Sequence, residues 1–206
     1  DKLKISVVSG WKEHLCSKTL PIKVIDKNLV DNDLKVTHWF HHDCLSEYYH
    51  IKVFSKAYYK VFDAYLRNYV ENGNTMLLVP LFTPCLDTEV GSERPTTQLV
   101  EVFKENDKWS FNFDKLDYYL SFIKERGIKY FEFSHLFTQW GAKFCPKVVY
   151  KENGKLVKGF GWKYESNSEE YREFLSALLP ELDKYLKSKQ YEKISVFHVS
   201  DEPNKD

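Results

Sequence analysis

The sequence lacks an excess of charge of either sign, because its 30 Lys and Arg residues balance its 30 Asp and Glu residues. Composition therefore gives no electrostatic case for binding nucleic acid or an anionic membrane surface. The sequence also lacks an apolar run long enough to span a membrane, and it shows no signal peptide. A chain that begins at Asp1 does not exclude a leader, however. We predict neither nucleic acid nor a membrane as a partner.

Cysteine is scarce, and its spacing does not suit metal binding. The four residues are Cys16, Cys44, Cys85 and Cys145, so neither a CxxC motif nor a Cys/His zinc pattern is present. We therefore predict no metal, no cofactor, and free, mostly buried thiols. Free thiols are typical of a reducing compartment, which favours a cytoplasmic location over secretion.

Aromatic residues, by contrast, are abundant at 17% of the chain. Composition alone favours an aromatic-rich core as the explanation. The alternative is a carbohydrate-binding surface, because the apolar C–H faces of sugar rings stack on aromatic planes. Two tryptophans, Trp140 and Trp162, fall in one predicted loop and slightly favour that alternative there.

Two regions differ in their hydrophobic pattern. Residues 1–34 contain two alternating segments, 3–8 and 20–25, which predict antiparallel strands joined by a polar linker. We interpret them as the end of a preceding β-sandwich domain. From residue 35 onwards, strand patterns alternate with helical ones. The predicted strands are 36–41, 75–82, 128–134 and 194–203, and the predicted helices are 56–71, 114–126 and 169–189. Ser55 and Asp114 are expected to cap the first two helices and Ser168 to begin the third, and the apolar stripes of the helices are expected to be buried. A β-hairpin is inserted near 97–113, and a turn is predicted at 152–155.

Repeated βα units predict an α/β fold with parallel strands, either an open sheet or a barrel. An open dinucleotide-binding sheet requires a glycine-rich turn after its first strand, and this chain has His-His-Asp-Cys (residues 41–44) there. The loops after the strands are long and polar, whereas the turns after the helices are short. That asymmetry is typical of a barrel, so residues 35–206 are predicted to be the first half of a (β/α)8 TIM-type barrel.

Each predicted strand leads into polar residues, which would meet at one rim of the barrel. Glu132 is equally well explained as an interior carboxylate paired with an Arg or a His, and His198 as a structural hydrogen-bonding residue. The candidate substrate contacts are His41, Asp43, Asp87, Arg94, Glu132, His135, Trp140 and His198, and the candidate catalytic pair is Asp201 and Glu202.

The adjacent carboxylates Asp201 and Glu202 suit acid/base work on a glycosidic bond, in which one group is protonated and the other ionised. Like charges that lie close together push their pKa values apart, which produces this division of roles. Two neighbours in sequence do not easily flank a sugar from both sides. They fit better a reaction in which the 2-acetamido oxygen of the substrate is the nucleophile.

Several blocks, in order, resemble the catalytic domain of glycoside hydrolase family 123 and its bacterial relatives. These blocks are Trp39–Cys44, Pro80–Thr88, Gly91–Val100, Phe131–Ala142 and His198–Pro203. The resemblance covers about residues 35–203. It implies a retaining, β-N-acetylgalactosaminidase-like enzyme that acts on an N-acetylhexosaminide glycan through an oxazoline intermediate. In the matching Ser-Asp-Glu-Pro motif, Asp201 would orient the acetamido group and Glu202 would be the general acid/base.

The family completes its barrel with about four more βα units, and this chain ends at the fourth predicted strand. We therefore expect the isolated 206-residue chain to be inactive, and either to self-associate through its exposed sheet edges or to be poorly stable. Two alternative functions stay open: a non-catalytic carbohydrate-binding module on a glycosidase scaffold, or a glycosidase of different sugar specificity.

Overall fold

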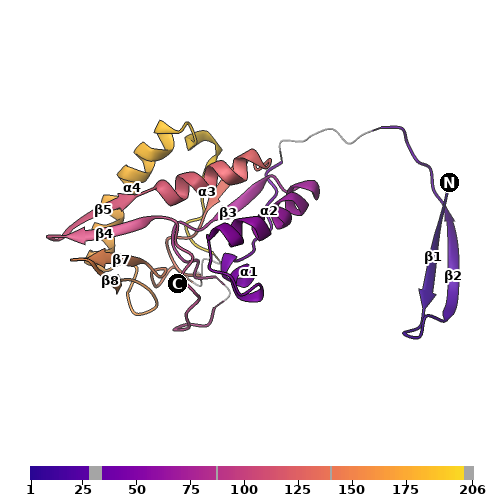
Figure 1. Cartoon of the computed structure of the whole chain (residues 1–206), viewed down its shortest axis with the longest axis horizontal. Coiled ribbons are helices and arrows are strands. Elements are labelled where there is room, and N and C mark those ends of the chain that lie inside the picture. The colour runs from indigo at the N-terminus through magenta and orange to yellow at the C-terminus, as the bar shows by residue number, and fades with distance from the viewer. Residues whose placement is uncertain (28–33, 87, 140, 202–206) are drawn as a thin grey trace. The chain divides into compact units, whose positions relative to one another are not determined.

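The computed structural model describes residues 1–27, 34–86, 88–139 and 141–201. The chain divides into two compact units, Asp1–Asp33 and Leu34–Asp206 (Figure 1), which are described separately below. The helices and strands that carry the candidate site all belong to the second unit.

The first unit contains an antiparallel hairpin of β1 (Lys2–Val8) and β2 (His14–Pro21). The hydroxyl of Ser9 closes the turn by accepting hydrogen bonds from the backbone N–H groups of Trp11 and Glu13. The prediction of a second strand at 20–25 is wrong in its extent. The strand ends at Pro21, which pairs with Lys2, and one further hydrogen bond joins the Ile22 N–H to the Asp1 carbonyl.

The second unit is built on three parallel strands, β3 (Met76–Val79), β6 (Tyr130–Phe133) and β9 (Ser195–Phe197), in the order β3-β6-β9. Leu78, Glu132 and Val196 lie next to one another across this sheet. The sheet and its helices confirm the α/β class. Among the described residues the sheet is open, with β3 and β9 at its edges, so a closed barrel is not formed by this part of the chain.

The predicted first strand at 36–41 is absent, and this prediction was wrong. Only Val36 joins the sheet through its backbone, because its carbonyl accepts hydrogen bonds from the N–H groups of Thr75 and Met76. The following residues are held by side chains instead: the His38 N–H donates to the Tyr69 hydroxyl at 2.8 Å. The chain then enters a short helix that the sequence did not predict, α1 (His42–Tyr48).

The three long helices are confirmed as α2 (Lys56–Glu71), α3 (Asp114–Glu125) and α4 (Glu169–Ser188). Ser55 and Ser168 cap α2 and α4 by accepting a hydrogen bond from a backbone N–H in the first turn. Asp114 was predicted to cap α3, but it is the first residue of the helix. The side chain of Asn112 accepts the Asp114 N–H instead, at 2.8 Å.

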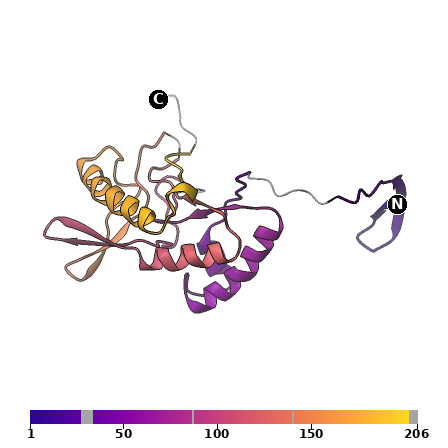
Figure 2. The ribbon, with the colours of Figure 1, turned by 90° about the horizontal axis from the view of Figure 1, so that it is seen from above.

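The helices pack largely through aromatic rings, which supports the core interpretation of the composition. Phe62 of α2 stacks on both Tyr119 and Phe122 of α3, with ring centroids 5.8 Å apart in each case. Figure 2 shows these two helices next to each other. Tyr185 of α4 stacks on Phe113, immediately before α3, at 5.0 Å.

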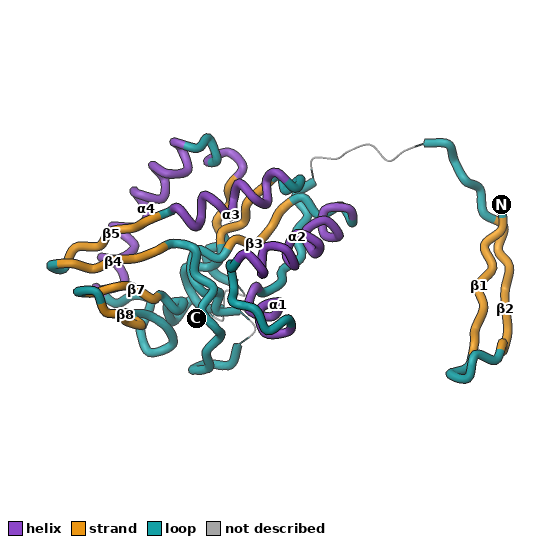
Figure 3. Tube along the Cα trace, in the orientation of Figure 1, coloured by secondary structure: helices purple, strands orange, loops and turns teal. Residues whose placement is uncertain are grey.

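A second sheet lies in the loops that follow β3 and β6. It contains β4 (Glu101–Glu105), β5 (Lys108–Asn112), β7 (Val149–Glu152) and β8 (Lys155–Lys158), in the order β5-β4-β7-β8 (Figure 3). The β4–β5 hairpin confirms the predicted insertion. Of the β7–β8 hairpin, only the turn at 152–155 was predicted. Parallel pairing of β4 with β7 joins the two hairpins, and the side chain of Gln98 bonds both to the N–H and to the carbonyl of Val149.

The last strand is much shorter than predicted. A 3-10 turn, η1 (Glu192–Ile194), precedes it, and β9 ends at Phe197 rather than at residue 203. All four cysteines are free, and Cys85 and Cys145 are buried while Cys16 and Cys44 are exposed. In the part of the chain that the structure describes, no helix has both the length and the apolar character needed to cross a bilayer.

Candidate active site at the carboxyl ends of the parallel strands

Glu132 lies in the middle of the parallel sheet and is buried. Its two carboxylate oxygens accept hydrogen bonds from Trp39 Nε1 and His198 Nδ1, each at 3.0 Å. A buried carboxylate is costly unless it is hydrogen-bonded, and these two donors satisfy one bond to each oxygen. Of the two interpretations left open by the sequence, the structure shows the pairing with a histidine.

The bond to Glu132 also orients the ring of His198. Because Nδ1 donates to the carboxylate, the other ring nitrogen, Nε2, is the one available for a ligand. The rings of His198 and His135 lie with their centroids 4.0 Å apart, and Trp39 contacts both rings edge-on. Trp39, His135 and His198 therefore form one aromatic cluster beside the buried carboxylate.

His135, two residues after β6, is only 1% exposed. Neither of its ring nitrogens has a hydrogen-bond partner among the described residues. Its pKa is lowered to about 4, mainly by burial and also by the nearby His198, while Glu132 partly opposes the change. His135 is therefore neutral at physiological pH, with one donor and one acceptor unused. Leaving such groups unpaired costs about 1–3 kcal/mol, a cost that protein interiors rarely carry without a ligand to satisfy them.

Asp201 lies on the segment that follows β9, next to this cluster. The backbone N–H of His198 extends the sheet contact by donating to Phe133, and the Ser200 hydroxyl donates to the carbonyl of Thr138 at 3.4 Å. Burial, together with the nearby charge of Asp201, raises the pKa of the Cys85 thiol to about 11. Asp201 thus lies within electrostatic reach of the loop that follows β3.

One group of side chains in the described part of the chain has the ligand types and the spacing for a metal ion. His135, His198 and Asp201 each offer one ligand atom, and these atoms all lie within 4.8 Å of one another. The same three groups offer hydrogen-bonding positions to hydroxyl and amide groups of a sugar. The prediction that no metal is bound here stays a prediction.

A second cluster holds the loop after β3 against α1. Arg94 donates to both carboxylate oxygens of Asp43, at 3.0 and 3.4 Å, and its third bond is to the carbonyl of Leu86 at 3.0 Å. Asp43 is buried, so this two-pronged ion pair fixes the position of the loop. Both residues were predicted to contact substrate, but the structure shows them bound to each other, and a role in binding stays a prediction.

The other predicted site residues are less well placed. His41 is the residue that precedes α1, where it is half-buried. Asp87, Trp140 and Glu202 lie outside the described residues, so their predicted roles stay predictions. The candidate site as described therefore consists of Glu132, His135, His198 and Asp201, with Arg94 and Asp43 behind the neighbouring loop.

Sequence reasoning missed Trp39 as a member of the site. Its side chain is the second donor to Glu132, and it reaches there from a segment that was predicted to be a strand. The sequence did contain a signal, because Trp39 immediately precedes the Phe-His-His-Asp segment, from which His41 and Asp43 were chosen as candidate substrate contacts.

Comparisons with known proteins identify a family for this sequence and a related fold. The sequence model described as "Glycoside hydrolase 123, catalytic domain" matches residues 39–206. No curated protein matches. Ten chains of solved structures do. One of these is a family 123 glycoside hydrolase from Clostridium perfringens, studied for glycolipid glycan hydrolysis. It shares 13% sequence identity at a TM-score of 0.57 over 77% of this chain. At that identity the similarity shows the fold alone, and this chain spans 28% of the length of that protein.

Proposed function

This chain belongs to glycoside hydrolase family 123, since the catalytic-domain model matches most of its length, and from that membership we propose that it hydrolyses the glycosidic bond of a 2-acetamido sugar. The proposed substrate is a β-linked N-acetylgalactosaminide within a glycan, and the reaction retains the configuration at the anomeric carbon. The three parallel strands are proposed to be part of a (β/α)8 barrel, because they are joined by helical crossovers and carry long loops at their carboxyl ends.

In the proposed mechanism the carbonyl oxygen of the substrate's acetamido group attacks the anomeric carbon. Glu202 donates a proton to the departing oxygen, and an oxazoline forms on the sugar. Glu202 then removes a proton from a water molecule. The water attacks the anomeric carbon, which opens the oxazoline ring and restores the acetamido group. Asp201 accepts the acetamido N–H and stabilises the positive charge that develops on the oxazoline.

The observation that carries the proposal is the cluster of His135, His198 and Asp201 beside the buried Glu132. These polar groups converge at the carboxyl ends of β6 and β9, and the ring nitrogens of His135 lack partners among the described residues. In barrel enzymes this end of the strands is where substrate binds. We propose that sugar hydroxyl groups satisfy His135 and the free nitrogen of His198.

The test is hydrolysis of an aryl β-N-acetylgalactosaminide by the full-length protein and by its Asp201→Asn variant. We expect the variant to lose turnover by about 10²–10⁴-fold, since the carboxylate no longer stabilises the oxazoline. The matched control is Asp183→Asn, which changes an exposed Asp on α4 whose ion pair within the described ranges is with Lys187.

The outcome separates the three candidate functions. Unchanged sugar binding without any turnover in the parent protein would indicate a non-catalytic carbohydrate-binding module. Turnover of sugars without an acetamido group, and no inhibition by a thiazoline that mimics the oxazoline, would indicate a different specificity. The same assay with the 206-residue chain tests our expectation that it is inactive alone.

A further inference from the structure

A pocket of about 290 Å³ lies beside the candidate site, between residues 83–94 of the loop after β3 and residues 145–164 of the loop after β6. Its volume is at the small end of the range for ligand pockets, about 300–1,000 Å³. Cys85 lines the pocket, and its thiol lies within electrostatic reach of Asp201. A ligand that filled the pocket would therefore lie next to the proposed catalytic end of the sheet.

The described residues that line this pocket carry a surplus of positive charge. Three lysines line it, Lys147, Lys158 and Lys163, and the only carboxylate among its described lining residues is that of Glu93. The Arg94 guanidinium also reaches the pocket, but Asp43 neutralises it. Among the described lining residues, three lysines therefore accompany one glutamate.

The ion pairs in the pocket use only part of this charge. Glu93 pairs with Lys158, and its other oxygen is 3.9 Å from the Lys147 nitrogen, near the limit for an ion pair. Lys163 forms no ion pair with any described residue. A small anion would meet ammonium groups whose charge a single glutamate does not balance.

Lys147 is the most buried of the three, with its side chain 13% exposed. Its nitrogen donates to the carbonyl of Arg94, which fixes it between the two loops. Burial lowers its pKa, and the nearby Asp43 partly restores it. A partly desolvated ammonium group gains more from a nearby anion than an exposed one, because the surrounding protein screens the charge less.

Three aromatic residues form another part of the pocket wall. Phe160, Trp162 and Tyr164 all line it, and the Trp162 ring is held by an edge-on contact with Phe144 at 5.8 Å. Aromatic planes receive the apolar faces of sugar rings, and ammonium groups bind acidic substituents. The two kinds of wall together match a sugar that carries a negative charge.

We propose that this pocket binds an anionic substituent, a carboxylate or a sulfate ester, on the sugar next to the hexosamine that is cleaved. The natural substrate is then an acidic glycan. This inference rests on the proposed function for the position of the hexosamine, and it adds the class of the neighbouring sugar.

The test measures binding to the full-length protein by calorimetry, with S-linked disaccharides that the enzyme does not cleave. Three ligands share the same N-acetylgalactosamine unit, and their second sugar is neutral, a uronic acid, or sulfated. We expect about tenfold tighter binding of at least one acidic ligand at low salt, equivalent to about 1.4 kcal/mol, and a smaller preference at high salt. Comparison of the two acidic ligands distinguishes carboxylate from sulfate.

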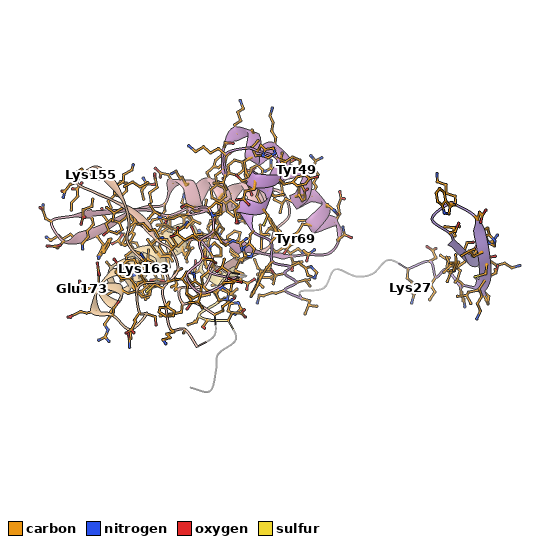
Figure 4. The ribbon with its side chains drawn as sticks, turned by 90° about the horizontal axis from the view of Figure 1, so that it is seen from below. Lys27, Tyr49, Tyr69, Lys155, Lys163 and Glu173 are labelled. Atoms are coloured by element: carbon orange, nitrogen blue, oxygen red, sulfur yellow. The ribbon has the colours of Figure 1, made fainter. Side chains whose placement is uncertain are left out.

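The double variant Lys158→Gln/Lys163→Gln is expected to reduce this preference to less than about twofold, because two of the three ammonium groups are lost. Both residues are exposed, so folding is expected to be preserved, and a melting curve checks it. The matched control is Lys155→Gln, at the other end of β8 and outside the pocket lining. Figure 4 shows Lys155 well separated from Lys163.

Equal affinities for the neutral and acidic ligands would overturn the inference, and so would a preference that survives in the double variant. Failure of the proposed function would be seen separately, as absence of hydrolysis of the aryl substrate by the parent protein. A salt-dependent preference that only the pocket variant removes supports the inference whether or not hydrolysis is observed.

Discussion

Two buried histidines of this chain have the same side chain but opposite surroundings. His42 is 4% exposed, and its ring nitrogens bond to the hydroxyl groups of Tyr58 and Tyr119. His135 is 1% exposed and has no hydrogen-bond partner among the described residues. Burial lowers the pKa of both, to about 3 for His42 and about 4 for His135. Both are therefore neutral at pH 7, and only the hydrogen bonds distinguish them.

This difference separates a structural histidine from a functional candidate. The bonds of His42 are complete within the core, where it joins α1 to α2 and α3, so nothing is left for a ligand. One ring nitrogen of His135 lies within 4.8 Å of a ligand atom of Asp201 and of His198. Burial alone does not mark a functional residue, whereas buried polar atoms without protein partners, in a cluster with other polar groups, make His135 a candidate. The same substitution at the two positions should therefore have opposite consequences.

The largest expected effect is on folding, in His42→Leu. Leucine approximately fills the space of the ring but leaves the hydroxyl groups of Tyr58 and Tyr119 buried without partners. At about 1–3 kcal/mol for each orphaned group, the unfolding free energy should fall by roughly 4 kcal/mol. Urea unfolding at pH 7 measures it. A loss below about 1 kcal/mol would show that the two hydroxyl groups find other partners, and the distinction between the histidines would fail.

At His135 the same substitution should affect function rather than folding. His135→Leu removes two polar atoms whose burial without partners costs about 1–3 kcal/mol, so the free energy of unfolding should stay level or rise and should not fall. Turnover of the aryl substrate by the full-length protein should fall by about a hundredfold, equivalent to about 2.7 kcal/mol, because the proposed bonds to sugar hydroxyl groups are lost. Equal destabilisation by the two leucine variants would contradict this assignment.

Lowering the pH should reduce the loss of stability that His42→Leu causes. The unfolded state binds a proton at this residue below pH about 6.5, whereas the folded state does so only near pH 3. In that window the folded state binds fewer protons, so stability falls as the pH falls, by about 1.4 kcal/mol per pH unit. Between pH 7 and pH 5 the cost of His42→Leu should shrink by about 2 kcal/mol. Unfolding curves at the two pH values test it, and an unchanged cost would argue against a neutral, buried ring.

The smallest expected effect is the loss of stability when Glu132 loses the hydrogen bond from Trp39. Trp39→Phe removes the indole N–H that bonds to this buried carboxylate and leaves His198 as its remaining donor. Stability should fall by about 1–2 kcal/mol, since hydrogen bonds to charged groups are among the stronger ones. Thermal unfolding measures it. The matched control is Trp11→Phe in the first unit, where the side chain is 91% exposed and no shift is expected.

The helices of the second unit were predictable because their signals are local. Ser55 and Ser168 cap their helices as expected, and the apolar stripes of α2 and α4 are buried as predicted. The prediction of a strand at 36–41 was wrong because alternating apolar residues show that a strand is possible, but do not show that a partner strand is available. The β7–β8 hairpin was missed for a related reason: its pairing with β4 joins residues about 50 positions apart.

In the candidate site, too, the features with local signals were predictable and those that depend on long-range contacts were not. The strand pattern placed Glu132 inside a strand and His135 just after it, and the pairing of Glu132 with a histidine was one of the two interpretations that the sequence allowed. The position of His198 just after β9 was not predicted, because the predicted strand continued to residue 203. The bond between Asp43 and Arg94 spans 51 positions, and no local pattern contains it. Nor does the sequence indicate which buried histidine lacks partners, because the hydroxyl groups that satisfy His42 come from two separate helices.

The parallel pairing of β4 with β7 also restricts the motion of the two loops that carry these strands. It fastens the loop after β3 to the loop after β6, and the side chain of Gln98 clamps the same junction. Neither loop can swing outward without breaking backbone bonds to the other. A bulky glycan that binds at these strand ends would therefore contact two loops that move together as one rigid unit.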